Sequence, residues 1–272
     1  MIDNTAFKKE LEERVKEINA GIAGYLPEEK GCQKTIFEAM NYSMNAGGKR
    51  LRPLLMQEVC RLFTGEVSEI VKPFMAAIEM IHTSSLVHDD LPCMDDDMIR
   101  RGKASTWAEY GEDIGVLAGD ALMMYAFETA SKAFDAAEDA DALLRAGKAM
   151  GILAAKTGVY GMIGGQTVDV ELAGGLVPKD KLDFIYRLKT GALLQAAMLI
   201  GAVLGGAADE DCKIVEDLAG KVGLAFQIQD DILDVTGDAS VTGKAAGSDE
   251  KNQKTTLSLI HISEPTRPEP IS

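Results

Sequence analysis

The sequence predicts an all-α fold in a single domain. Apolar residues recur at helical spacing along most of the 272-residue chain, and no segment shows strand alternation followed by a hairpin turn. Long segments rich in alanine and leucine and almost free of proline are expected to form helices at 74–88, 117–133, 143–157, 182–204 and 214–235. Because no low-complexity linker divides the chain, we expect one helical domain over residues 1–256.

The two ends of the chain differ in their predicted structure. Phe7, Leu11 and Val15 recur at helical spacing among charged residues, which predicts a first helix rather than a signal peptide. Between the helices, glycine pairs are interpreted as breaks. These pairs are Gly47-Gly48, Gly164-Gly165, Gly174-Gly175 and Gly205-Gly206. Residues 257–272 carry three closely spaced prolines, which cannot continue a helix. They could be a native flexible terminus, but we favour a non-native, foreign or read-through tail.

Composition and charge exclude several classes of function. Lys and Arg number 28 against 43 Asp and Glu, which gives a net charge of -15 and argues against a general nucleic-acid binder. The four cysteines form no CxxC pair and histidine is scarce, so a zinc site is not expected. Isolated thiols fit a reducing cytoplasm. No uncharged apolar run reaches a membrane-spanning length of about 18–20 residues, so we expect no membrane span.

A first acidic cluster occupies residues 89–97, which read Asp-Asp-Leu-Pro-Cys-Met-Asp-Asp-Asp and follow the predicted helix at 74–88. The helix dipole disfavours anions at this end by up to about 1 kcal/mol, and five aspartates in nine residues repel one another. A fold tolerates such a cluster when cations neutralise it, and Mg²⁺ binds one or two carboxylates with waters and phosphate oxygens. Taken alone, the cluster could equally be a solvated acidic patch.

A second acidic cluster makes the patch a weaker explanation. Asp230 and Asp234 are four residues apart and therefore share one helix face with Gln227. Apolar residues interleave with them, so the carboxylates are expected to line the rim of an apolar interior. Basic segments accompany the acidic ones: Gly-Gly-Lys-Arg-Leu-Arg-Pro at 47–53, and Arg100-Arg101-Gly-Lys directly after the first cluster. Arginine forks and lysine ammonium groups bind polyphosphates. Neither basic segment matches a Walker loop or a Rossmann turn.

With both clusters and the 47–53 segment, the chain resembles the trans-isoprenyl diphosphate synthases, a family that includes farnesyl and geranylgeranyl diphosphate synthases. The resemblance runs from the first helix to about Thr256, and residues 82–92 look like the family's first aspartate-rich motif with its two-residue insertion. It implies the isoprenoid synthase fold, a helical bundle around a deep central cavity, working as a homodimer. It also implies a prenyltransferase that condenses isopentenyl diphosphate with dimethylallyl, geranyl or farnesyl diphosphate and releases pyrophosphate.

The resemblance also assigns roles to individual residues. Three Mg²⁺ ions on the allylic diphosphate would be held by Asp89, Asp90, Asp95, Asp230 and Asp234. That diphosphate would also contact Arg100, Lys189 and Lys244. Isopentenyl diphosphate would contact Lys49, Arg52, His82 and Arg101. Thr190 and Gln227 would face the reacting carbon, and Lys254 would belong to a closing C-terminal region.

Product length is expected to depend on Ser84 and Ser85, which lie about one helical turn deeper than Asp89. In the family a bulky residue here tends to stop growth at fifteen carbons, so two serines favour twenty. Three alternatives remain open. A class I terpene cyclase shares the fold and the first ionisation, a non-catalytic synthase subunit shares the family, and an acidic protein could bind cations without any substrate.

Overall fold

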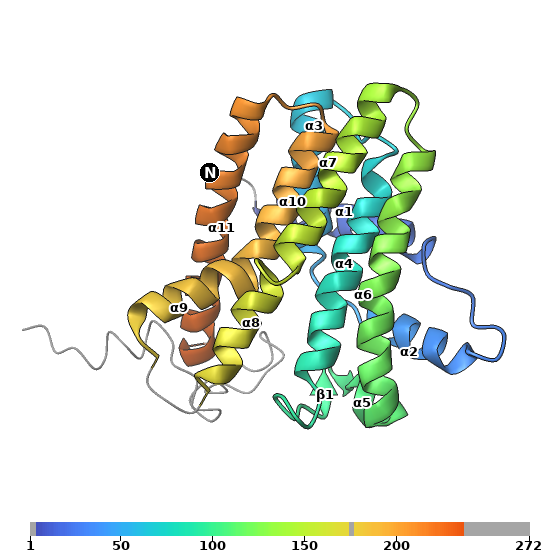
Figure 1. The fold of residues 1–272 in the computed structure, drawn as a ribbon, viewed down its shortest axis with the longest axis vertical. Helices are drawn as coiled ribbons and strands as arrows, with labels where there is room; N and C mark the ends of the chain where they lie inside the picture. Colours follow the sequence, from blue (N-terminus) through green and yellow to red (C-terminus); the bar gives the residue numbers. More distant parts are fainter. Residues whose placement is uncertain (1–3, 174–176, 237–272) are drawn as a thin grey trace, which may run out of the picture.

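The computed structural model describes residues 4–173 and 177–236, and these residues form a bundle of helices (Figure 1). The first half contains α1 Asn4–Ala23, α2 Lys34–Met44, α3 Leu51–Thr64, α4 Val71–Asp89, α5 Thr106–Tyr110 and α6 Glu112–Asp135. The second half contains α7 Ala140–Thr157, α8 Met162–Glu171, α9 Lys179–Ile185, the π-helix η1 Tyr186–Thr190, α10 Gly191–Leu204 and α11 Asp209–Thr236. The predicted all-α class is confirmed. Helices α4, α6, α7 and α11 each extend beyond their predicted range by a few residues, whereas the segment predicted as one helix over 182–204 is divided among α9, η1 and α10.

The core lies around α4 and α10, which are apolar on nearly every face and are therefore buried. Helix α4 packs along α6 and α3, whereas α10 packs against α3, α7 and α11. The run Lys179–Leu204 has the length and hydropathy of a membrane-spanning helix, but 61% of that window is buried inside the bundle. A core helix of a helical bundle has the same properties.

A short strand pair interrupts the helical pattern, which the sequence did not predict. Strands β1 Ile99–Arg100 and β2 Lys103–Ala104 pair antiparallel, with Arg100 opposite Lys103. The turn between them has positive φ at Arg101 and Gly102, the geometry of a two-residue hairpin. Two residues per strand are too few to show the alternation that predicts a strand.

The glycine pairs have three different outcomes. Gly205-Gly206 follows the end of α10 as predicted, with φ 80° at Gly206, and Gly47-Gly48 lies in the connection from α2 to α3. Gly174-Gly175 lies outside the described residues. The expected break at Gly164-Gly165 is wrong, because both residues lie inside α8. A Cβ on Gly165 would collide with the backbone of Lys189, so this glycine allows α8 to approach η1 closely.

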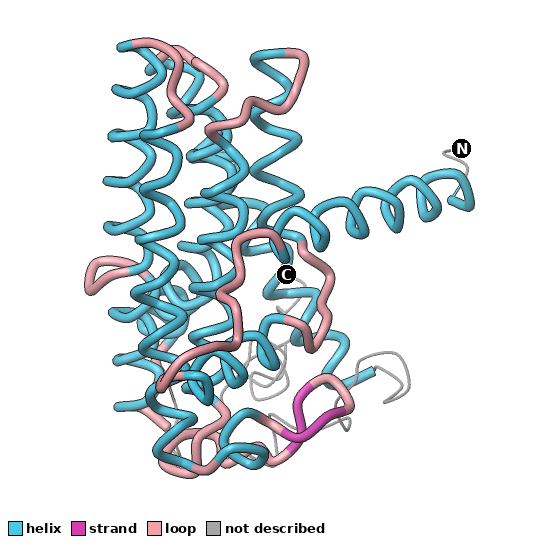
Figure 2. Tube along the Cα trace, turned by 90° about the vertical axis from the view of Figure 1, so that its right-hand side faces the viewer, coloured by secondary structure: helices cyan, strands magenta, loops and turns pink. Residues whose placement is uncertain are grey.

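Two helices, α4 and α11, carry the two predicted acidic clusters to one end of the bundle. Helices α4 and α11 both run to the lower end in Figure 1, and α8 lies between them. The strand pair lies at the same end, whereas α1 projects sideways from the bundle (Figure 2). The two acidic segments are therefore carried to the same end of the molecule.

Candidate active site

The first acidic cluster folds into a compact turn at the end of α4. The Asp95 N–H donates to the carbonyl oxygen of Asp89 at 2.8 Å, and the Asp97 N–H donates to that of Asp90 at 3.1 Å. Asp96 takes a left-handed conformation with φ 53°, which aspartate tolerates better than most residues. The turn folds the chain back on itself, so Asp89 and Asp95 become neighbours although six positions separate them.

Asp89 is held from a second helix. The Gln166 Nε2 on α8 donates to the Asp89 Oδ1 at 2.7 Å. An amide hydrogen bond of this kind fixes the orientation of a carboxylate before a metal or phosphate arrives. The sequence analysis missed Gln166. Its signal was a polar side chain directly after two glycines near the start of α8.

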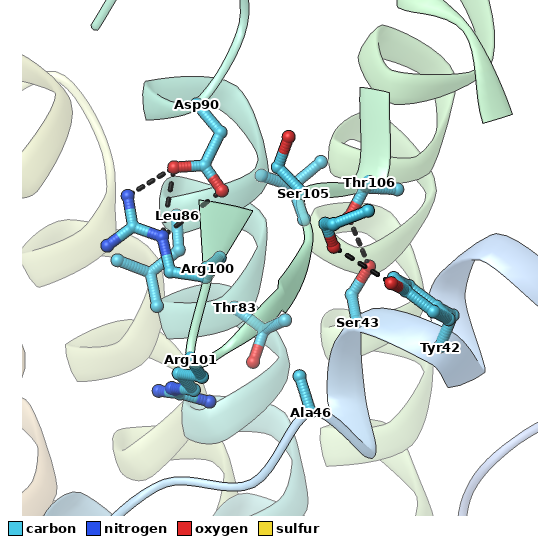
Figure 3. A pocket seen from close by; sticks show the side chains of 12 residues that line it. Tyr42, Ser43, Ala46, Thr83, Leu86, Asp90, Arg100, Arg101, Ser105 and Thr106 are labelled. Carbon is cyan, nitrogen blue, oxygen red and sulfur yellow. Dashed lines mark hydrogen bonds and ion pairs between the residues drawn. The ribbon is translucent and has the colours of Figure 1, made fainter. Parts of the chain in front are cut away.

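Asp90 pairs with Arg100 in this structure (Figure 3). The Arg100 Nε donates to Asp90 Oδ1 at 2.9 Å and to Oδ2 at 3.1 Å, and the Arg100 Nη2 donates to Oδ1 as well. Asp90 is only 2% exposed. Burial lowers the pKa of Arg100, but the hydrogen bond to Asp90 and the charges of Asp90, Asp97 and Asp89 raise it overall. Arg100 is therefore a fixed cation at the rim of the acidic turn.

Arg101 lies over the glycine turn between α2 and α3. Its Nη1 donates to the carbonyl oxygen of Gly47. A Cβ on Gly48 would lie 3.0 Å from the guanidinium carbon of Arg101, at φ 136°, so glycine both permits the backbone conformation and leaves room for the cation. Lys49 is exposed and Arg52 is half-buried on the first turn of α3. The two basic segments of the sequence thus meet in space.

His82 lies on α4 among these cations. Burial lowers the pKa of His82 well below its usual range, and the positive charges of Arg52, Arg101, Arg50 and Arg100 lower it further. His82 is therefore neutral near neutral pH, and the surrounding positive charge is carried by guanidinium groups. Such a group of cations within an acidic protein is suited to binding a diphosphate.

We expect the half-buried, neutral His82 to make stability depend on pH. Below about pH 6.5 the unfolded histidine takes up a proton that the folded one does not, because its folded pKa is lowered. Stability is then present above the unfolded pKa and falls as the pH drops below it. Urea unfolding between pH 7.5 and pH 5 should show a steeper loss for the wild type than for His82→Gln. If both proteins lost stability equally with falling pH in this range, the neutral state assigned to His82 would be contradicted. Above pH 7.5 the stability of both proteins should depend on pH in the same way.

The lysine predicted to contact the allylic diphosphate lies in the π-helix. The Lys189 Nζ forms an ion pair with Asp169 Oδ2 on α8 at 2.6 Å. The π-helix η1 separates α9 from α10 within the helix predicted over 182–204, and π-turns within helices frequently mark functional sites. Asp169 was also missed by the sequence analysis. It lies three residues after Gln166, so both project from one face of α8.

The remaining predicted residues are placed only in part. Thr190 ends η1 and is half-buried, and Gln227 lies half-buried on α11. Asp230 and Asp234 belong to the final turns of α11, but their side chains lie outside the described part of the structure. Lys244 and Lys254 lie outside the described residues. Ser84 is fully buried on α4, and the half-buried Ser85 donates its hydroxyl to the His82 carbonyl at 2.9 Å.

The donors present fit Mg²⁺. Asp89 and Asp95 supply hard carboxylate oxygens from adjacent points of one turn. Among the side chains that the structure describes, which do not include those of Asp230 and Asp234, no three acidic, histidine or cysteine groups gather closely enough to hold a metal ion by themselves. Mg²⁺ commonly takes only one or two carboxylates and completes its shell with waters and substrate phosphates. This donor set therefore suits an ion that arrives with a diphosphate.

Comparisons with known proteins point to one family. A family model described as "Polyprenyl synthetase" matches residues 33–271. The farnesyl diphosphate synthase of Geobacillus stearothermophilus is 40% identical over 92% of this chain and 82% of its own length. The large subunit 1 of the heterodimeric geranylgeranyl pyrophosphate synthase of Arabidopsis thaliana, a chloroplastic protein, is 45% identical over 83% of this chain. The chain spans 61% of the length of this and two further plant relatives.

Solved structures show the same fold. A geranyltransferase of Helicobacter pylori, complexed with magnesium and isoprenyl diphosphate, matches with a TM-score of 0.80 and 30% identity, covering 97% of this chain and 86% of its own. An FPP/GFPP synthase of Zymomonas mobilis matches with a TM-score of 0.78 and 33% identity, covering 95% of this chain and 91% of its own. These likenesses confirm the all-α isoprenoid synthase fold.

Proposed function

Because the chain belongs to the polyprenyl synthetase family, we propose that it is a prenyltransferase that condenses isopentenyl diphosphate with an allylic diphosphate. The allylic substrates would be dimethylallyl, geranyl and farnesyl diphosphate, and the products farnesyl or geranylgeranyl diphosphate. One observation carries the proposal: the acidic turn at Asp89–Asp95 lies at the end of α4, and the arginine group around His82 lies beside the same helix. This arrangement offers adjacent places for two diphosphates.

The acidic side would receive the allylic diphosphate. Asp89 and Asp95, with Asp230 and Asp234 from α11, would hold Mg²⁺, which when bound supplies Lewis-acid stabilisation of the departing pyrophosphate. We propose three ions with substrate present. Asp90, whose carboxylate pairs with Arg100 in this structure, would join these aspartates as a magnesium ligand when the diphosphate binds. Arg100 and Lys189, with Lys244, would add fixed positive charge to the leaving group.

The basic side would receive isopentenyl diphosphate. Lys49, Arg52 and Arg101 would bind its diphosphate, and neutral His82 would contribute a hydrogen bond without adding charge. Ionisation of the allylic carbon–oxygen bond leaves an allylic cation, and the double bond of isopentenyl diphosphate attacks it. The proton then lost would pass to the released pyrophosphate. Thr190 would direct oxygen dipoles at the cation, and the apolar surroundings would exclude water, which would otherwise quench it.

Turnover tests this proposal directly. Purified protein is incubated with isopentenyl and dimethylallyl diphosphates and Mg²⁺, and the products are separated by chain length after removal of their phosphates. We expect a prenyl diphosphate of fifteen or twenty carbons and an equivalent release of pyrophosphate. Cyclic hydrocarbon from an allylic diphosphate alone would instead indicate a cyclase, which nothing in the comparisons favours. Absence of any product would contradict the proposed activity of this chain.

We propose that the protein works as a homodimer. Helix α6 lies at one edge of the bundle (Figure 1) and exposes Val116, Leu117 and Met124, while α7 exposes Leu143 and Leu144. Apolar side chains of this size on adjacent helices favour burial against another subunit. One relative is named as a subunit of a heterodimer, so light scattering of the purified chain, alone and with a candidate partner, tests the assembly. We also propose a cytoplasmic location, which the four free cysteines support.

Product length should respond to the two serines below Asp89. Ser85 is half-buried, so Ser85→Tyr can extend a ring toward the growing chain and should shift the product toward fewer carbons. Ser84 has no exposed surface. Ser84→Tyr should therefore shorten the product but also overpack the core, which lowers the free energy of unfolding by about 1–3 kcal/mol. Chromatography of the products and thermal unfolding measure the two effects. Unchanged length in both variants would reject these positions as determinants, and Ser85→Ala should leave the length unchanged.

A further inference from the structure

A buried ion pair lies directly behind the basic side of the site. Arg50 is 4% exposed and Glu79 is 2% exposed, and the Arg50 Nη1 donates to Glu79 Oε1 at 2.8 Å. The other nitrogens of the same guanidinium are also used. Nε donates to Asn19 Oδ1 at 2.7 Å, and Nη2 donates to the carbonyl oxygen of Met44 at 2.6 Å. One side chain therefore joins α1, the end of α2, and α4.

The backbone of Arg50 is unusual in the same place. Arg50 precedes α3 with φ 48° and ψ 34°, a left-handed conformation that side chains with a Cβ rarely adopt. Such a conformation persists only where the surroundings determine it. Here the hydrogen bonds from the Arg50 guanidinium to Asn19, Met44 and Glu79 hold the backbone in this conformation. Glycine would adopt the same backbone without strain, so the arginine side chain is the feature that needs an explanation.

The segment fixed by Arg50 is the one that carries the predicted contacts to isopentenyl diphosphate. Lys49 precedes Arg50 directly, and Arg52 follows two residues later on the first turn of α3. Arg101 donates to the carbonyl oxygen of Gly47 in the same connection. The position of all three cations therefore depends on the course of one connection, and Arg50 is the residue that ties it to α4.

We propose that the Arg50–Glu79 ion pair is a positioning device that sets the affinity for isopentenyl diphosphate and leaves the affinity for the allylic substrate unchanged. The inference rests on the proposed function, because it assigns Lys49, Arg52 and Arg101 to that substrate. Neither Arg50 nor Glu79 needs to touch the substrate. Their role is to hold the 47–52 connection in the form that presents the neighbouring cations together, so that binding need not order it.

Glu79 separates this role from a simple effect of charge. Burial lowers the pKa of Arg101, and the negative charge of Glu79 raises it, so Glu79 lies close enough to weaken the positive field that attracts a diphosphate. If charge alone mattered, Glu79→Gln would strengthen binding of isopentenyl diphosphate. If the ion pair positions the connection, the same substitution weakens binding, because the amide no longer gives Arg50 a charged acceptor. The two explanations therefore predict changes of opposite sign.

The test measures both substrates in the full-length protein. For Glu79→Gln and Arg50→Lys we expect the KM for isopentenyl diphosphate to rise about tenfold, the scale of one weakened contact to a charged group. The KM for dimethylallyl diphosphate should stay within about twofold of the wild type. Calorimetric binding of isopentenyl diphosphate, which does not react without an allylic partner, gives the same comparison without turnover. A stronger affinity in Glu79→Gln, or equal changes in both KM values, would overturn the proposal.

Two further variants separate positioning from folding. Removing one partner of a buried pair can destabilise a protein, whereas replacing both partners with apolar residues often does not. The double variant Arg50→Met, Glu79→Met should therefore have an unfolding temperature closer to that of the wild type than a variant that removes only one partner. It should still bind isopentenyl diphosphate weakly. Recovered affinity in this double variant would overturn the proposal. Lys156→Gln breaks the network with Gln195 and Glu216, far along the chain from the 47–52 connection, and should leave the affinity unchanged.

The outcome for the wild type keeps this inference distinct from the function on which it rests. A wild-type protein that neither binds isopentenyl diphosphate nor forms product contradicts the proposed function. A wild-type protein that binds it, accompanied by variants that bind equally well, contradicts only the role of Arg50 and Glu79.

Discussion

Asp89→Asn is expected to lower kcat by about a thousandfold, the scale of losing one preorganised contact to charge that develops in the transition state. The substitution removes the negative charge but keeps an oxygen that can accept the hydrogen bond from Gln166. The shape of the turn should therefore survive, and the loss should lie in metal binding and catalysis. Rates at saturating substrate over a range of Mg²⁺ concentrations measure the effect.

Two comparisons make the Asp89 result specific. Asp135→Asn changes an exposed aspartate at the end of α6 and should leave kcat unchanged. Thermal unfolding of Asp89→Asn should match the wild type within about 0.5 kcal/mol, as for most substitutions away from buried charges. A kcat within tenfold of the wild type would show that Asp89 is not a metal ligand in the reaction.

Arg100→Gln is expected to reduce the free energy of unfolding by about 3 kcal/mol, because it leaves the Asp90 carboxylate buried and without its cation. For a chain of this size the corresponding fall in Tm is roughly 6–12 °C. Activity should fall as well, since Arg100 stands at the rim of the acidic turn. Chemical denaturation and calorimetry measure the stability, and a double-mutant cycle with Asp90→Asn isolates the coupling between the two residues.

An exposed ion pair provides the matched control for Arg100. Lys72 and Glu69 pair at 2.5 Å on the surface, with both side chains largely exposed, and such pairs contribute at most about 1 kcal/mol. Lys72→Gln should therefore change stability little. If Arg100→Gln were no more destabilising than Lys72→Gln, the buried Asp90 carboxylate would not depend on Arg100 for compensation of its charge. The stabilising role assigned to this ion pair would then be wrong.

The long helices could be predicted because their pattern is strong and local. Helix α10 is apolar on all faces, and α4 runs without a break to the first aspartates, so both could be placed within a few residues. The strand pair escaped prediction because its geometry depends on the turn at Arg101 and Gly102 rather than on alternation. The glycines of α8 misled the analysis for a similar reason. Gly165 allows close contact with η1, and Gly164 leaves room for the Val159 carbonyl before α8; both contacts are visible only in three dimensions.

The site residues divide in the same way. The aspartates and arginines were found because their charges stand together in the sequence. Gln166, Asp169 and Glu79 were not predicted because the partner of each side chain comes from a distant segment of the chain. Even so, a single carboxylate within the apolar run of α4 requires a cation nearby, because burying an unpaired charge is costly. That requirement points to a partner without identifying Arg50.

The close approach of Gly165 to Lys189 limits how α8 and η1 can move relative to each other. Since no Cβ fits between them, α8 and the π-turn should shift as one piece when the bundle flexes. Gln166 on α8 orients the Asp89 carboxylate, and Asp169 on the same helix orients the Lys189 ammonium group. Any displacement of α8 would then move Asp89 and Lys189 together, so the distance between the acidic turn and this cation is expected to change little.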